Sequence, residues 1–229
     1  MILNHHISQW FGNKLNLSSR SRYLNSYYNY SQEVSTMNHF FTIEDNIVNQ
    51  KYNHTLEASH EVQSLNPYLN CERRAELNEL LPSNHNTQSF DWEGVTVEVI
   101  KFKLAVGMHK LKLRIILLEG NVMSISYHFK NNLSLEEKLE VIHNVVLAKY
   151  VNLEDVVDEQ TAMDFLNKRL CIRDDQQGLI TIGNQLKFEV LMVKNADYYA
   201  SILKELRLNK ALKAERSRKK SFKEMKSLI

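Results

Sequence analysis

The stretch from Val95 to Phe129 constrains the fold of this chain more than any other feature. It contains three runs in which apolar and polar residues alternate, separated by two short turns that contain Gly107 and Gly120. Strict alternation is typical of a strand with one buried face. Glycine supplies the positive φ that tight turns need. The pattern therefore predicts an antiparallel, three-stranded meander.

The apolar rows of the three runs also predict the register of the strands. With short turns, the apolar residues of each run face those of the next run. The expected pairs are Leu104–Leu111, Phe102–Leu113, Ile100–Ile115, Leu117–Met123, Ile115–Ile125 and Leu113–Tyr127. Because a slip of one residue would turn a strand inside out, the agreement of the three rows restricts the register.

One irregularity lies near Val99, where the alternation changes phase. Val95, Val97 and Val99 follow one phase, whereas Ile100 and the apolar residues after it follow the other. A β-bulge at this point would absorb the extra residue, and this is the preferred interpretation. The alternative is a strand that is buried on both faces at its start.

The same register makes the opposite face of the meander strongly positive. Lys101 should face Arg114, and Lys103 should face Lys112. This surface, the basic face, consists of Lys101, Lys103, Lys110, Lys112 and Arg114, with Ser126 and His128 beside them. Like charges opposite each other on a sheet are destabilising, by up to ~1 kcal/mol per pair. Three explanations stay open: a solvated face, cover by an acidic helix of the same chain, or a docking surface for an anionic partner.

Composition excludes several classes of protein. Of the 229 residues, 43% are hydrophobic, so a substantial core is expected and global disorder is not. Cys71 and Cys171 follow no spacing motif, which is typical of a reducing compartment. No apolar run is long enough to span a membrane, and the first residues do not resemble a signal peptide. We therefore expect a cytoplasmic protein without a membrane segment.

Residues 1–89 show little periodicity and are interpreted as a poorly patterned N-terminal region, partly helical or mobile. Within it we expect a strand at 39–43 and short helices at 53–62 and 70–81. Residues 83–88 have the composition of a loop. That loop places a boundary before an α+β core domain, residues 90–195, which is followed by a C-terminal basic helix, residues 196–229.

A helix is expected directly after the meander. Ser134 and Glu137 form a capping box, and the helix should reach about Tyr150. Its apolar residues recur at helical spacing and should cover the apolar face of the sheet. They are Leu135, Leu139, Ile142 and Val146. Two short helical pieces should follow within residues 152–170, the second opened by Thr161.

A second hairpin is expected within residues 179–193, with a three-residue turn. The expected pairs are Ile182–Leu186 and Ile180–Phe188. These strands would either extend the first sheet to five strands or form a separate layer.

The C-terminal helix should be capped by Asn195 or Asp197 and change character along its length. Its first half offers Tyr199, Ile202, Leu203 and Leu206 for packing. The chain has 29 Lys and Arg against 27 Asp and Glu, but from Leu203 onward there are ten Lys and Arg against three Glu. The residues before Leu203 thus carry 19 cations and 24 carboxylates, with the most acidic patch at Glu154–Glu159. The tail is either a solvated helix or an electrostatic contact with phosphate or an acidic protein.

No catalytic or metal-binding pattern is evident. On a helix, His54, Glu57 and Glu61 would share one face, and Glu57-x-x-His60 is half of a di-iron motif, but no second copy exists. The two cysteines lack the surroundings of a nucleophile, and the six glycines form no phosphate-binding loop. Asp174 and Asp175 could bind a cation, but an acidic pair in a turn is most simply explained as solvated.

These observations predict an α+β protein: an antiparallel meander at about 95–129 covered by a helix, a second hairpin and a long basic C-terminal helix. The preferred function is non-catalytic binding of an acidic protein, as in an inhibitor, immunity or adaptor protein, without a cofactor or metal. Nucleic-acid binding is the second interpretation, and an enzyme of unrecognised class is the third. The predicted partner-binding residues are Lys101, Lys103, Lys112, Arg114, His128, Arg216, Arg218, Lys219 and Lys220.

Overall fold

The computed structural model describes residues 52–92, 94–151, 159–183 and 188–228. All of them belong to the second of two compact units, Glu44–Ile229. The strand expected at 39–43 lies outside the described residues. The described chain has the predicted α+β fold.

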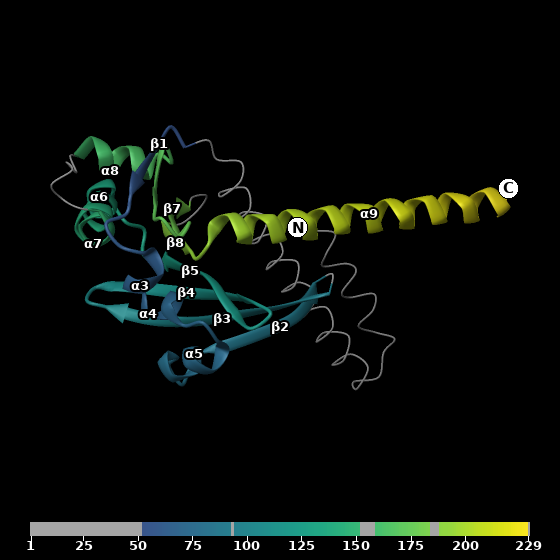
Figure 1. Ribbon diagram of the computed structural model, residues 1–229, viewed down its shortest axis with the longest axis horizontal. Helices are drawn as coiled ribbons and strands as arrows, with labels where there is room; N and C mark the ends of the chain where they lie inside the picture. Colours follow the sequence, from purple (N-terminus) through teal and green to yellow (C-terminus); the bar gives the residue numbers. More distant parts are fainter. Residues whose placement is uncertain (1–51, 93, 152–158, 184–187, 229) are drawn as a thin grey trace, which may run out of the picture. The chain divides into compact units, whose positions relative to one another are not determined.

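The described strands form one sheet of eight (Figure 1). Their order across the sheet is β1 (His54–Glu57), β6 (Leu170–Arg173), β7 (Leu179–Gly183), β8 (Glu189–Val193), β5 (Asn121–Phe129), β4 (His109–Leu118), β3 (Val95–Val106) and β2 (Asn86–Trp92). Neighbouring strands are antiparallel, except that β1 and β6 are parallel. The predicted meander is β3–β4–β5, flanked by β2 on one side and β8 on the other.

The meander has the predicted register over most of its length. The confirmed pairs are Ile100–Ile115, Phe102–Leu113, Leu104–Leu111, Ile115–Ile125 and Leu113–Tyr127. The exception is Leu117, which pairs with Val122 instead of Met123, because the register shifts between Ile116 and Leu117. The irregularity of the meander therefore lies in the pairing of β4 with β5.

The bulge expected near Val99 is wrong. β3 pairs with both β2 and β4 without a register shift. Val97, Val99 and Ile100 are each 0% exposed, although Val99 and Ile100 point to opposite faces. The change of phase marks the part of β3 that is buried on both faces, which was the alternative interpretation.

The first face of the sheet carries the main core. Ile100, Leu113, Ile115 and Ile125 on this face are fully buried. In the described part of the chain, seven short helical elements supply residues to the layer that covers it. They are α3 (Val62–Leu65), α4 (Pro67–Asn70), α5 (Arg74–Leu80), α6 (Leu135–Val141), the π-helical η2 (Ile142–Leu147), α7 (Ala148–Tyr150) and α8 (Glu159–Leu166).

The helix predicted after Ser134 is present as α6, η2 and α7, and it begins with the predicted capping box. Ser134 Oγ accepts from Glu137 N at 3.2 Å, and Glu137 Oε2 accepts from Ser134 N at 2.7 Å. Ile142 and Val146 are buried as expected. Leu135 is 54% exposed, because it lines an open groove beside α8 instead of reaching the sheet.

The second hairpin extends the first sheet and does not form a separate layer, since β8 pairs with β5 and β7 with β8. Its predicted register is wrong. Ile182 pairs with Val190, and Ile180 pairs with Met192. The connection is thus longer than a three-residue turn, and its residues 184–187 lie outside the described residues. The shift spans an even number of residues, so each side chain stays on the predicted face.

Several short elements differ from the prediction. Residues 54–57 form β1, not a helix, and the helix expected at 70–81 begins only at Arg74. The loop expected at 83–88 changes into β2 at Asn86, and α8 starts at Glu159, before Thr161. β6 was not expected at all. Each element is too short to show periodicity, and tertiary pairing determines its structure.

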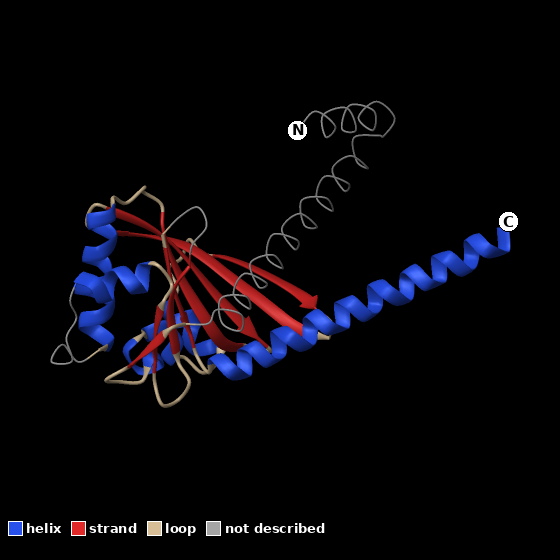
Figure 2. Ribbon diagram, turned by 90° about the horizontal axis from the view of Figure 1, so that it is seen from above, coloured by secondary structure: helices blue, strands red, loops and turns tan. Residues whose placement is uncertain are grey.

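The long helix α9 (Ala196–Leu228) begins on the second face of the sheet. Asn195 caps it, because Asn195 Oδ1 accepts from Tyr198 N at 3.2 Å. Tyr199 lies against Arg114 and Ser124 of the second face. The predicted packing residues Tyr199, Leu203 and Leu206 are buried. From Ala211 onward every described side chain is exposed, and Figure 2 shows the helix continuing past the strands.

Candidate binding face

Strand pairing places the predicted cations in two adjacent rows on the second face. One row crosses Lys103, Lys112, His128, Glu189 and Gly183. The next row crosses Lys101, Arg114 and Ser126. The predicted pairs Lys101–Arg114 and Lys103–Lys112 are confirmed. Lys103 and Lys110 are exposed, whereas Lys101, Lys112 and Arg114 are partly buried.

Lys101 lies where positive charge is unfavourable. Burial, with Arg114 and Lys112 nearby, lowers the pKa of Lys101 to about 8. Its Nζ donates to Gln88 Oε1 of the neighbouring strand β2 at 2.8 Å. A neutral amide is the acceptor here, so this hydrogen bond does not neutralise the charge. A negative group placed nearby would stabilise the charged form of Lys101.

Arg114 is a second partly buried cation of the basic face. Burial lowers the pKa of Arg114, although Glu189 and Tyr199 oppose the shift. Its Nε is buried and has no hydrogen-bond partner among the described residues. Leaving such a donor unpaired costs ~1–3 kcal/mol. The unpaired Nε therefore adds to the cost of holding positive charge on this face.

Glu189 also lies on this face, although no sequence pattern predicts it there. Its Oε1 lies 3.1 Å from His128 Nε2 across the pairing of β5 with β8. Burial raises the pKa of Glu189, while a hydrogen bond from Ser126 and the charges of Arg114 and Lys168 oppose the shift. Among the described residues, Glu189 thus places one carboxylate beside these cations, and its own charge is partly buried.

Gly183 makes room for that carboxylate on the adjacent strand β7. A Cβ at Gly183 would lie 2.9 Å from Glu189 Oε2, which is closer than van der Waals contact allows. The absence of a side chain at this point of the row lets Glu189 lie flat over β7. No local pattern reveals this arrangement, because it depends on how β7, β8 and β5 pair.

Ser126, His128 and Glu189 have the composition of a catalytic triad but not its geometry. A triad needs the serine at one ring nitrogen of histidine and the acid at the other. Here Ser126 Oγ and Glu189 Oε1 both lie 3.1 Å from His128 Nε2. Ser126 is also only 1% exposed. The cluster therefore positions charge and does not activate a nucleophile.

The predicted site residues of the tail lie on the exposed half of α9. Arg216, Arg218, Lys219 and Lys220 are all exposed. Lys219 Nζ lies 2.7 Å from Glu215 Oε1, and the Arg218 guanidinium lies 5.6 Å from the centre of the Phe222 ring. Both of these contacts are between residues of the same helix.

The acidic patch was the intramolecular candidate for covering the basic face. Its residues 154–158 lie outside the described residues. Glu159 begins α8, which packs with α6 and η2 over the first face. This carboxylate is therefore on the opposite side of the sheet from Lys103 and Lys112.

The metal and thiol candidates do not form sites. His54 and Glu57 lie on strand β1, where residues three apart point to opposite faces, so they do not share a face as on a helix. Among the described residues, no group of three His, Cys, Asp or Glu side chains could hold a metal ion. Cys71 and Cys171 are buried, and burial raises the pKa of each thiol.

Asp174 is a structural carboxylate, which corrects its interpretation as a solvated turn residue. It is 7% exposed. Its Oδ2 accepts from Val62 N at 2.5 Å, and its Oδ1 accepts from Gly178 N at 2.6 Å. Asp174 thereby joins the start of α3 to the turn between β6 and β7.

Comparison with known proteins adds no family. No protein-family model, curated protein or solved structure matches the chain. No helix among the described residues is both long enough and apolar enough to cross a bilayer. The charges and geometry of the second face are therefore the basis for inferring a function.

Proposed function

We propose that the chain is a non-catalytic binding protein and that an acidic protein docks on the basic face. One observation carries this proposal. On the second face of β3, β4, β5 and β8, the described residues include the five cations of the basic face and one carboxylate, Glu189. Part of this excess charge is buried, where it is costly. Carboxylates of a partner, placed against Lys101 or Lys103, would offset the cost.

Glu189 favours an acidic protein over nucleic acid as the partner. A nucleic-acid strand carries a charge at every phosphate, so a strand crossing the two rows would also meet the Glu189 carboxylate. A protein presents separate carboxylates that need lie only over the cations. The planar guanidinium of Arg114 suits such groups, because it can bind one carboxylate through two hydrogen bonds.

Fluorescence anisotropy with defined probes tests the proposal. The probes are a labelled poly-glutamate peptide and a labelled single-stranded oligonucleotide of equal charge, each titrated with the full chain. The test variant is Lys103→Glu/Lys112→Glu. The matched control, Lys138→Glu/Lys149→Glu, makes the same charge change on α6 and α7. We expect the test variant, but not the control, to lose affinity for the peptide by about tenfold or more.

Two results would overturn the proposal. Equal peptide affinity for the two variants would show that the basic face is only a solvated surface. Tighter binding of the oligonucleotide, weakening log-linearly with salt and lost in the test variant, would assign the face to nucleic acid.

A further inference from the structure

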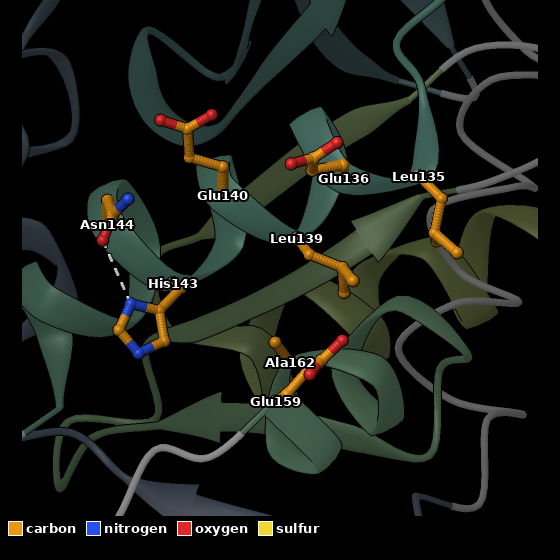
Figure 3. A pocket seen from close by; sticks show the side chains of 8 residues that line it. All are labelled: Leu135, Glu136, Leu139, Glu140, His143, Asn144, Glu159 and Ala162. Atoms are coloured by element: carbon orange, nitrogen blue, oxygen red, sulfur yellow. Dashed lines mark hydrogen bonds between the residues drawn. The ribbon is translucent and has the colours of Figure 1, made fainter.

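An open groove of about 770 Å³ lies between α6–η2 and α8 (Figure 3). It is lined by Leu135, Glu136, Leu139, Glu140, His143, Asn144, Glu159 and Ala162. Leucine side chains from α6 form its apolar part. The glutamates give it negative charge from both helices, and no Lys or Arg is among these lining residues. The groove therefore combines an apolar floor with an acidic rim.

The second half of α9 has the opposite charge and also exposes apolar side chains. The exposed fractions are 59% for Leu208, 42% for Leu212, 53% for Phe222 and 49% for Met225. At 3.6 residues per turn, Leu208, Leu212 and Phe222 fall on one side of the helix. Arg218 and Lys219 lie beside Phe222 on the same stretch. An isolated helix of this kind is only marginally stable in water, so packing against a second surface would stabilise it.

We propose that the groove binds the second half of α9 from another copy of this chain. Charge complementarity identifies the occupant: the rim supplies Glu136, Glu140 and Glu159, and the helix supplies Arg216, Arg218, Lys219 and Lys220. Apolar side chains are exposed on both partners. An amphipathic helix laid in a groove is a common mode of protein recognition, with anchors at i, i+3 and i+4.

The contact must form between two copies. α9 is one continuous helix from Ala196 to Leu228, and its first turns pack on the second face through Tyr199 and Leu203. The groove belongs to the helices that cover the first face. A straight helix that leaves from one face cannot turn back to the other side of its own sheet.

The association is head-to-tail, because each copy contributes one helix and one groove. Such heterologous contacts give a ring if the rotation between copies closes, and an extended assembly if it does not. The proposal does not depend on the basic face, which lies on the other side of the sheet. Its failure would leave the proposed function untouched.

A peptide with the sequence of residues 207–226 provides a direct test. The labelled peptide is titrated with the full chain by anisotropy, and self-association of the full chain is measured by sedimentation velocity. Glu136→Lys/Glu140→Lys reverses the rim. Glu72→Lys/Glu79→Lys makes the same charge change on exposed residues outside the groove, as a control. Circular dichroism shows whether each variant is folded.

We expect the peptide to bind the wild-type chain and the control, and the rim variant to lose affinity by about tenfold or more. A peptide with Leu212→Ser/Phe222→Ser should bind the chain more weakly, although its charge is unchanged. A chain with Arg216→Glu/Arg218→Glu should associate with the rim variant but not with itself, because the exchange of charges restores complementarity.

The proposal is overturned if the full chain stays monomeric and does not bind the peptide. It is also overturned if the rim variant and the control bind the peptide equally. If the peptide binds a duplex or single-stranded oligonucleotide but not the chain, α9 serves a nucleic-acid contact instead.

Discussion

His128 Nε2 lies 3.1 Å from Glu189 Oε1, across the pairing of β5 with β8. The hairpin that completes the sheet thereby also brings a carboxylate into the rows of cations. Arg114 and Lys168 act on the same carboxylate. The protonation of Glu189 therefore links the stability of the fold to the charge of the basic face.

Glu189→Gln should stabilise the fold more at neutral pH than at acidic pH. Burial raises the pKa of Glu189, so the folded chain holds this proton more tightly than the unfolded chain. Protonated Glu189 stabilises the fold at pH values below its pKa in the unfolded chain, which is about 4.3. This stabilisation is lost as the pH rises through the pKa of Glu189 in the folded chain. Glutamine does not titrate, so the variant does not lose stability in this way.

Urea unfolding of wild type and variant over this pH range measures the effect. The free energy of unfolding of the variant, minus that of the wild type, should increase with pH. Glu79→Gln, an exposed carboxylate on α5, is the control and should show no trend. A difference that falls as the pH rises would show that His128 and Arg114 stabilise the Glu189 carboxylate by more than its burial costs.

Ile115 tests the packing of the meander. Ile115 and Ile125 pair across β4 and β5, and each is 0% exposed. Ile115→Ala should cost about 2–5 kcal/mol by leaving a cavity. Ile115→Asp should prevent folding, because it buries an unpaired carboxylate. Circular dichroism during urea unfolding measures both; a folded Ile115→Asp chain with near-wild-type stability would contradict the assigned core.

The meander could be predicted because its signal is local. Alternation over three adjacent runs indicates which side chains face the core, and short turns leave one register for most rows. The shift between Ile116 and Leu117 could not be predicted in this way. The same register places Lys101 opposite Arg114. The capping box at Ser134 could be predicted for a similar reason, since its two partners lie three residues apart.

The remaining elements depend on contacts between distant segments. β6 is buried at Leu170, Cys171 and Ile172, so it has no alternation to detect. Residues 54–57 become a strand only because β6 offers them a parallel partner. Glu189 reaches the basic face for a similar reason: nothing in its own hairpin shows that β8 pairs with β5.

The exposed half of α9 should contribute little to the stability of the domain. Every described side chain from Ala211 onward is exposed. Truncation after Leu212 should therefore change the melting temperature by less than about 2 °C in dilute solution, where copies are separated. Truncation after Tyr199 also removes the buried Leu203 and Leu206, and should lower the melting temperature by about 5 °C or more. Differential scanning calorimetry compares the two; a large drop for the first would show that the tail packs on the domain.

Substitution of Asp174 should destabilise the fold more than substitution of most other polar residues. Its carboxylate accepts from the backbone amides of Val62 and Gly178, and it is 7% exposed. Asp174→Ala leaves both donors buried without an acceptor, so we expect a loss of about 3 kcal/mol. The neighbouring exposed Asp175→Ala should cost less than about 0.5 kcal/mol. Equal costs in chemical unfolding would mean that Asp174 is solvated and does not join the two segments.

Lys101 should take up a proton when an anionic group binds the basic face. Burial, Arg114 and Lys112 hold its pKa at about 8, below its unfolded value of about 10.4. Its contribution to folding is thus present above the unfolded pKa and is lost as the pH falls through about 8. A nearby carboxylate favours the charged amine and raises this pKa. Near its own pKa the amine is half protonated, so binding should be accompanied by uptake of up to about half a proton.

Calorimetric titration of the poly-glutamate peptide, in two buffers of different ionisation enthalpy at this pH, measures that uptake. For the wild-type chain, and for the control Lys138→Met, the heat of binding should differ between the two buffers. For Lys101→Met, the heats in the two buffers should be equal, because methionine has a similar length but no amine to titrate. If the wild-type heats also agree while the peptide binds, Lys101 does not meet the ligand, and docking takes place elsewhere on the basic face.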